Sequence, residues 1–201
     1  MFTGIIKGTG TIKIVTKTKT DMRLEVNSPC LKNEKINIGD SISINGTCLT
    51  VVQLVDNNIY FDLMNETLLR TTFNDLQNGD EVNVETSLML NDKLDGHIVY
   101  GDVDSVGEIT SIDIIGDSKI YKIKYPHDFA KYIISKGRVT IDGASLTIVD
   151  VDDSDSTFTI SLIPHSLKIL NISNKKINDK VNIEYDVYAK LVHRQLRLKN
   201  D

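Results

Sequence analysis

The sequence predicts an all-β protein made of two homologous barrels followed by a C-terminal helix. The first observation is a repeat: S-I-N-G-T-C-L-T-V-V at 43–52 resembles T-I-D-G-A-S-L-T-I-V at 140–149, so residues 45 and 142 correspond, an offset of 97. V-N-V-E at 82–85 also returns as V-N-I-E at 181–184, an offset of 99. Similar blocks in the same order at nearly constant spacing indicate a duplicated unit of about 95 residues.

The second observation is that each unit is composed of short runs rich in Ile, Val and Thr. In the first unit turn signals such as Asn45-Gly46 separate these runs, which cover 10–15, 21–26, 41–44, 48–54 and 59–63. Short strands with closely spaced turns favour a small closed barrel, which leaves no exposed sheet edge. We therefore expect each unit to be a small antiparallel barrel of five or six strands.

Three helices are expected besides the strands. One covers 64–72, and a second covers 128–135, with Asp128 as its N-cap and Gly137 as its stop. The third, over 186–199, places Val187, Leu191 and Leu198 on one stripe. It belongs to neither repeat, so its apolar face needs a partner, and a second copy of the chain is the expected one.

The repeat also predicts the domain boundaries. The first barrel is expected over residues 1–97, the second over 98–186 and the helix over 187–201. The connector is short, because Gly101 in the second unit already corresponds to Gly4 in the first. We therefore expect the two barrels to be held tightly together.

Composition excludes several classes of function. The 201 residues carry 23 Lys and Arg against 28 Asp and Glu, a balance that argues against nucleic-acid binding. The sequence has no apolar run of about 20 residues, the length that a membrane span needs. Cys30 and Cys48 are too few for a disulfide framework, and the first residues do not resemble a signal peptide. A cytoplasmic location is expected.

Five blocks together resemble the riboflavin synthase family of lumazine-binding barrels, over essentially the whole chain. They are M-F-T-G-I-I at 1–6, N-G-T-C-L-T-V at 45–51, G-H-I-V-Y-G-D-V-D at 96–104, I-D-G-A-S-L-T-I at 141–148 and V-N-I-E-Y-D at 181–186. The resemblance implies a transferase that dismutates two molecules of 6,7-dimethyl-8-ribityllumazine into riboflavin and 5-amino-6-ribitylaminouracil. A four-carbon unit is transferred, without cofactor or metal.

The resemblance also implies two homologous six-stranded antiparallel Greek-key barrels and a homotrimer assembled through the C-terminal helix. The active site would lie between the N-terminal barrel of one subunit and the C-terminal barrel of its neighbour, and lumazine synthase is a candidate partner. The duplication suits this chemistry, because two related pockets can hold two copies of one substrate in opposite roles. Orientation of that kind can be worth roughly 10⁵–10⁸ M in effective concentration.

Site residues follow from the same resemblance. The catalytic set comprises Phe2, Ser41, Cys48, His97, Asp102 and Asp186. The substrate-binding set comprises Thr3, Gly4, Ile5, Ile6, Leu49, Thr50, Asp62, Leu63, Met64, Asn65, Glu66, Thr67, Gly101, Val103, Lys136, Ser145, Leu146, Thr147, Ile160, Ser161, Leu162, Ile163, Pro164 and His165. In the runs 62–67 and 160–165, backbone amides can read the pyrimidine edge of the ligand.

Several of these residues have a structural alternative. Cys48 could attack or hydrogen-bond the lumazine, or it could be an ordinary buried thiol. Thr50 would share its face of the strand, because alternate residues point the same way. Asp186 could instead cap the last helix, and Lys136 could favour a helix C-terminus. Gly4 would allow the backbone to approach a flat ring.

The sequence departs from the family pattern at one place. The family has a second histidine where this chain has Asp102, and an aspartate is a weaker base in water than histidine. Slower turnover, a different base such as His97, or lumazine binding without conversion all remain open. The alternative function is therefore a non-catalytic antenna that binds lumazine or flavin.

Two other patterns are rejected. Gly8 and Gly10 lack the third glycine and the helix of a dinucleotide-binding loop. His97, Asp102 and Asp104 are too loosely spaced to predict a metal site.

Overall fold

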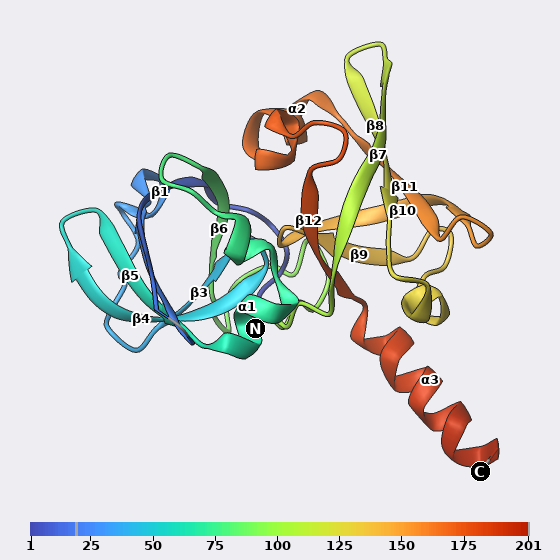
Figure 1. The fold of residues 1–201 in the computed structure, drawn as a ribbon, viewed down its shortest axis with the longest axis horizontal. Helices are drawn as coiled ribbons and strands as arrows, with labels where there is room; N and C mark the ends of the chain where they lie inside the picture. The colour runs from blue at the N-terminus through green and yellow to red at the C-terminus, as the bar shows by residue number, and fades with distance from the viewer. Residues whose placement is uncertain (19, 201) are drawn as a thin grey trace.

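The strands of the computed structural model, which describes residues 1–18 and 20–200, close into two antiparallel barrels (Figure 1). The first barrel has the order β1-β2-β5-β4-β3-β6, and its strands are β1 Gly8–Lys17, β2 Met22–Asn27, β3 Ser41–Ile44, β4 Thr47–Val55, β5 Asn58–Leu63 and β6 Glu81–Thr86. The second repeats this order six strands later, with β7 Ser105–Ile115, β8 Ser118–Lys124, β9 Arg138–Ile141, β10 Ala144–Asp152, β11 Thr157–Leu162 and β12 Lys180–Tyr185. The predicted fold class is confirmed.

The duplication extends to irregularities of the backbone. The β1–β2 register shifts between Ile12 and Ile14, and the β7–β8 register shifts between Ile109 and Ser111. Both shifts lie at corresponding positions, 97 residues apart. Each bulge increases the local bend of a long strand, which helps a small sheet close on itself.

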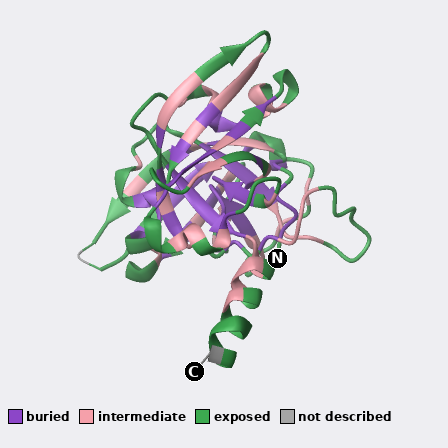
Figure 2. Ribbon diagram, turned by 90° about the vertical axis from the view of Figure 1, so that its right-hand side faces the viewer, coloured by how far each residue is buried: buried purple, intermediate pink, exposed green. Residues whose placement is uncertain are grey.

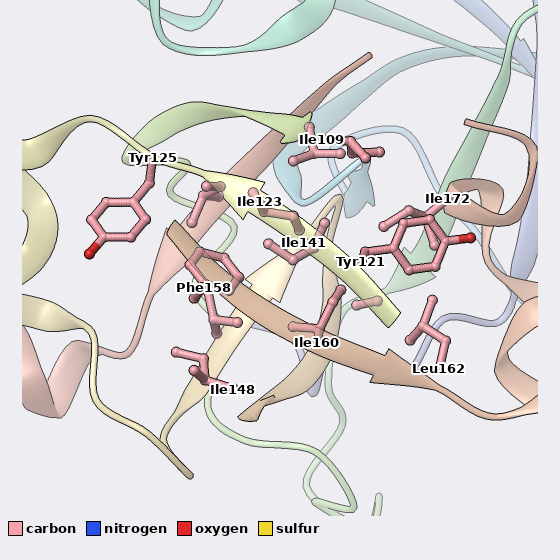
Figure 3. Close-up of a cluster of buried hydrophobic side chains, with 14 of the residues drawn as sticks. Ile109, Tyr121, Ile123, Tyr125, Ile141, Ile148, Phe158, Ile160, Leu162 and Ile172 are labelled. Carbon is pink, nitrogen blue, oxygen red and sulfur yellow. The ribbon is translucent and has the colours of Figure 1, made fainter. Parts of the chain in front are cut away.

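Each barrel packs its own hydrophobic core. In the second barrel Tyr121, Ile123, Phe158 and Ile160 point inward from neighbouring strands (Figure 3). In the first barrel Phe61 and Val84 are among the buried residues that do the same. Buried residues therefore gather in the body of the molecule, whereas strand tips and the last helix are exposed (Figure 2).

The short helices also follow the repeat. Helix α1, Asn65–Arg70, and the 3₁₀ helix η2, Thr72–Asp75, correspond to α2, Pro164–Ile169, and η4, Asn171–Asn174. The prediction for 128–135 was wrong in type and cap, because this segment is a 3₁₀ helix, η3, over His127–Tyr132, and Pro126 is its N-cap. It packs Phe129 and Tyr132 against Tyr185, and a 3₁₀ turn suits so short a segment. One further 3₁₀ helix, η1, covers Pro29–Leu31.

Helix α3, Val187–Asn200, projects away from both barrels (Figure 1). Asp186 caps it, because its Oδ1 accepts a hydrogen bond of 2.9 Å from the Tyr188 N–H. Tyr188, Leu191, Val192 and Leu196 are each more than half exposed. The predicted tail ended at residue 201, which lies outside the described residues. Among the described helices, none has the length and apolarity needed to cross a membrane.

The barrels meet through two hairpin turns placed back to back. Asn45-Gly46 and Asp142-Gly143 all have positive φ, as a tight hairpin turn of this kind requires. A Cβ on Gly46 would lie 2.6 Å from the Gly143 nitrogen, and one on Gly143 would lie 2.8 Å from the Gly46 nitrogen. No Cβ fits at these distances, so only glycine can occupy either position, and the turn sequence itself allows the barrels to touch.

Buried amides complete this junction. The Asn83 Nδ2 donates to the Asp142 carbonyl at 2.9 Å, and the Asn182 Nδ2 donates to the Asn45 carbonyl at 2.8 Å. Asn83 and Asn182 are repeat mates, so the junction has an approximate twofold symmetry. Asn171 strengthens one side by donating to the Asn45 Oδ1 at 3.0 Å.

Candidate functional site

Each repeat begins with a leading segment, residues 1–7 in the first repeat and 98–104 in the second. Each leading segment lies against the barrel of the other repeat. Phe2 and Val99 pair, with N–H to carbonyl distances of 2.7 and 3.1 Å, and so hold the two segments together. The Gly4 carbonyl accepts from the Ser145 N–H at 2.8 Å, and the Gly101 carbonyl accepts from the Cys48 N–H at 2.9 Å. Two pseudo-symmetric half-sites result, one around Cys48 and one around Ser145.

The first half-site is a cavity of about 330 Å³ on the outside of the first barrel. It is lined by Thr47, Cys48, Glu66, Thr67, Arg70, Thr71, Gly101, Asp102, Val103 and Asp104. The wall therefore combines β4 and α1 of the first repeat with the leading segment of the second. Five of the predicted residues besides Cys48 meet in this cavity: Glu66, Thr67, Gly101, Asp102 and Val103.

Other predicted residues of the first half-site lie on the strands beside Cys48. Ser41 is the cross-strand neighbour of Thr50, and Asp62 pairs with Arg23 at 3.7 Å on the outer surface. Leu49 and Leu63 point into the barrel core, so only their backbone can contact a ligand outside it. Met64 and Asn65 form the β5–α1 junction, where Met64 is exposed.

The second half-site is centred on Ser145 and His97. The His97 Nδ1 lies 2.7 Å from the Ser145 Oγ, and the donor depends on the tautomer of the ring. Burial lowers the pKa of His97; the negative charge of Asp186 opposes this shift and the positive charge of Arg138 adds to it. His97 is therefore mainly neutral at neutral pH and able to accept a proton.

Arg138 and Thr147 form the rim of the second half-site. The Arg138 guanidinium donates to the Thr147 Oγ1 at 3.3 Å, which places a cation next to a predicted ring-contacting residue. Its repeat mate is Ser41, an uncharged side chain. The two half-sites are thus related in backbone and different in charge.

The remaining predicted residues divide between surface and core. Ile6, Ile160 and Leu162 are buried in the second core, and Leu146 packs against it. Thr3 is buried. The more accessible positions are Ile5, Ser161, Ile163, Pro164 and His165. Lys136 has φ +64, a strained conformation for a lysine, where its repeat mate is Gly39.

The structure separates the predicted catalytic residues. Cys48 and Asp102 share the first half-site, whereas His97 and Asp186 belong to the second. Phe2 is fully buried, and a Cβ on Gly101 would lie 2.9 Å from its ring, so it supports the Gly101 segment from below. Asp186 has the alternative role, as the cap of α3, and its negative charge also acts on His97; its predicted catalytic role stays a prediction.

Sequence reasoning missed four charged residues of these half-sites: Arg70, Arg138, Glu85 and Glu184. Arg70 lines the first cavity, and Arg138 borders the second half-site. Glu85 and Glu184 accept backbone hydrogen bonds from the two leading segments. Their signal was present, because both stand at the end of the repeated V-N-V-E and V-N-I-E blocks. Among the described residues, no group of three or more His, Cys, Asp and Glu could hold a metal ion.

Known proteins resemble this chain over its whole length. The lumazine binding domain model matches residues 3–87 and again residues 100–186. Riboflavin synthase of Bacillus subtilis (strain 168) is 41% identical over 202 residues, which cover 100% of this chain and 92% of that protein. Riboflavin synthase of Actinobacillus pleuropneumoniae is 40% identical over 199 residues, 99% of this chain and 91% of that one.

Solved structures agree in fold. LumP complexed with riboflavin superposes with a TM-score of 0.85 at 29% identity, covering 92% of this chain and 100% of that chain. LumP complexed with 6,7-dimethyl-8-(1'-D-ribityl) lumazine gives a TM-score of 0.83 at 27% identity, covering 92% and 99%. The two matched domains and the full-length identity lead to one conclusion: this chain belongs to the riboflavin synthase family of lumazine-binding proteins.

Proposed function

We propose that the protein is a transferase that dismutates two molecules of 6,7-dimethyl-8-ribityllumazine into riboflavin and 5-amino-6-ribitylaminouracil. One observation carries this function: the chain presents two half-sites of the same backbone design, each built from both repeats. A reaction between two copies of one substrate needs two related pockets that face each other. Holding both molecules in register supplies much of the acceleration.

The different side chains of the half-sites suit different roles. In the second half-site, neutral His97 next to Ser145 accepts a proton from the acidic 7-methyl group of a bound lumazine. In the first, Cys48 is placed to add to, or hydrogen-bond, the ring of the other lumazine, and Asp102 shares its cavity. Arg138 stabilises negative charge that develops after the proton leaves.

The active site is completed by a second copy of the chain. We propose a homotrimer in which α3 buries its exposed apolar residues, so that the first half-site of one subunit faces the second half-site of its neighbour. The proposed division of the chain remains residues 1–97, 98–186 and 187–201. Cys30 and Cys48 are free thiols in agreement with a cytoplasmic location, and lumazine synthase is a proposed partner that supplies the substrate.

A turnover assay tests the function. Purified protein is mixed with 6,7-dimethyl-8-ribityllumazine, and flavin absorbance is followed with calorimetry of ligand binding in parallel. We expect one riboflavin for every two lumazines consumed, and two bound ligands for each pair of facing half-sites. Tight binding without riboflavin formation would contradict the enzyme and support the antenna function, which the likeness to LumP and the presence of Asp102 make the second candidate.

A further inference from the structure

Two buried glutamates hold the leading segments of the two repeats. The Glu85 Oε1 accepts from the Thr3 N–H at 2.7 Å and from the Thr3 hydroxyl at 2.6 Å, and its Oε2 accepts from the Gly4 N–H at 3.1 Å. Glu85 is 2% exposed. A carboxylate with this many donors fixes the direction of the segment as well as its position.

Glu184, the repeat mate of Glu85, binds the second leading segment in the same way. Its Oε1 accepts from the Tyr100 N–H at 2.8 Å, and its Oε2 accepts from the Gly101 N–H at 2.9 Å and from the Asp102 N–H at 3.2 Å. Glu184 is 4% exposed. Three successive backbone N–H groups therefore converge on one side chain.

Each segment then contacts the opposite barrel at very short range. A Cβ on Gly101 would lie 2.7 Å from the Cys48 Cβ, and a Cβ on Gly4 would lie 2.5 Å from the Ser145 Cβ. Each leading segment therefore forms one wall of a half-site, and a glutamate of the same repeat holds it there: Glu85 for the first segment and Glu184 for the second. The dependence is crossed: the second repeat controls the half-site on the first barrel, and the reverse.

We propose that Glu184 is the positioning residue of the Cys48 half-site and that Glu85 is the positioning residue of the Ser145 half-site. The roles in catalysis rest on the function proposed above, whereas the crossed control of the two half-sites can be measured without it. Neither glutamate needs to touch the substrate. Each acts through the glycine carbonyl that it places on the opposite barrel.

The surroundings of Glu184 make its hold sensitive to pH. Burial raises its pKa to about 7, and the facing charges are Asp104, before β7, and Lys190, on α3. Asp104 and Lys190 themselves pair at 2.8 Å, and the strand neighbour of Glu184 in β9 is the uncharged Thr140. Protonation removes the negative charge of Glu184 and makes one of its oxygens a donor, so the hydrogen bonds from the three N–H groups become weaker.

Thiol alkylation measures the crossed control directly. In a Cys30→Ser background, Cys48 is the one remaining cysteine of the sequence, and its alkylation rate reports how firmly Gly101 covers it. We expect Glu184→Gln to increase this rate about tenfold, because the variant loses charge-assisted hydrogen bonds to the segment that carries Gly101. The matched variant Glu85→Gln should increase the rate much less, because it reaches Cys48 only indirectly, through the Phe2–Val99 pair.

The results separate this inference from the proposed function. Equal rates in Glu184→Gln and in the background, or an equal increase in Glu85→Gln, would overturn crossed control even if the protein makes riboflavin. A protein that makes no riboflavin but shows the expected difference in alkylation would retain the crossed control and lose the proposed function. Bound riboflavin should protect Cys48 in the background protein, which links the rate to the half-site.

The unchanged protein provides a second measurement in case Glu184→Gln does not fold. Hydrogen–deuterium exchange of the peptide that contains residues 100–102 is compared between about pH 8 and about pH 6, after correction for intrinsic exchange. Protection should fall at the lower pH as Glu184 becomes protonated. The tip of the β7–β8 hairpin serves as reference, and equal protection at both pH values would contradict the role of Glu184.

Discussion

Asp102 is the residue at which we expect this chain to depart from the family pattern, and a substitution there can test the chemistry directly. It lines the same cavity as Cys48, and its backbone N–H is held by Glu184. His97, the nearest alternative base by sequence, belongs instead to the Ser145 half-site. The first half-site therefore contains a carboxylate at the position where the family resemblance leads us to expect an imidazole.

Restoring the histidine should accelerate the reaction. We expect Asp102→His to raise riboflavin formation several-fold at neutral pH, because an imidazole with a pKa near 6.5 exchanges protons more readily than a carboxylate. The measurement is the initial rate of flavin absorbance, with Asp102→Asn as the control that removes the base. A rate that does not change in Asp102→His would mean that proton transfer at position 102 does not limit turnover, and it would contradict a role for this residue as a base.

Asp142 is an unusual residue of the junction, because it is fully buried and its repeat mate is the neutral Asn45. Burial raises its pKa, and Lys175 opposes this shift from 3.5 Å. The Asp142 Oδ1 also accepts from the Asn182 N–H at 2.8 Å. One ion pair thus distinguishes the two sides of an otherwise symmetric contact.

Removing the cation should destabilise the fold most at high pH. For Lys175→Met we expect a loss of about 3 kcal/mol near pH 8, because one buried charge is left without its partner. A group with a raised folded pKa stabilises at low pH and loses that contribution as pH rises, so the loss should be smaller near pH 5. Denaturant unfolding at both pH values provides the measurement. Adding Asp142→Asn should recover most of the stability, and an unaltered deficit in the double variant would contradict this account.

At the scale of elements, the back-to-back turns β3–β4 and β9–β10 decide how closely the barrels approach. Gly46 has φ +80, and Gly143 has φ +83. The backbone of each glycine fills the space that a side chain on the other glycine would need. Each glycine also adopts a backbone conformation that disfavours side chains. These two requirements can be separated experimentally.

Gly46→Ala should therefore cost more than a glycine substitution that meets only the conformational requirement. We expect a loss of more than about 2 kcal/mol in the free energy of unfolding, because the new methyl group meets the Gly143 backbone. Gly79→Ala is the matched control, since Gly79 has φ +96 with nothing within 4 Å of a built Cβ. It should lose only about 1 kcal/mol, and equal losses in the two variants would show that close packing contributes nothing.

At the scale of the whole molecule, α3 packs only part of its surface against its own chain and leaves most of its apolar side chains exposed. Its base is anchored, because Lys190 pairs with Asp104 and His193 packs edge-on against Tyr132. Its apolar residues remain exposed along the whole helix, starting with Tyr188 in the first turn, whereas Figure 2 shows the buried residues in the body of the molecule. A helix anchored along one face and apolar on another exposed face is expected of an element that joins subunits.

A charge on the exposed face should disrupt the assembly. We expect Leu191→Asp to reduce the sedimentation coefficient from that of the proposed trimer to that of a monomer. It should also abolish riboflavin formation, because the proposed active site combines half-sites of different subunits. Ile114→Asp, at the exposed tip of the β7–β8 hairpin, is the matched control and should retain both properties. Full turnover by a monomeric Leu191→Asp protein would contradict the shared site.

The sequence by itself determined the duplication, the barrel class and the two Asn-Gly and Asp-Gly turns, and it left the cap of α3 as one of two alternatives for Asp186. These follow from local patterns: strand alternation, turn chemistry and an acid before a helix each depend on a few neighbouring residues. The placement of Cys48 and Thr50 on the outer face of β4 follows from the same alternation. The resemblance added the identities of the site residues.

Only the tertiary structure decided which of these residues meet. It paired His97 with Ser145 rather than with Cys48, crossed the leading segments and placed Glu85 and Glu184 beneath them. It also made 127–132 a 3₁₀ helix packed on Tyr185. The physical reason is that these contacts join residues tens of positions apart, where packing and burial, rather than periodicity along the chain, select the partners.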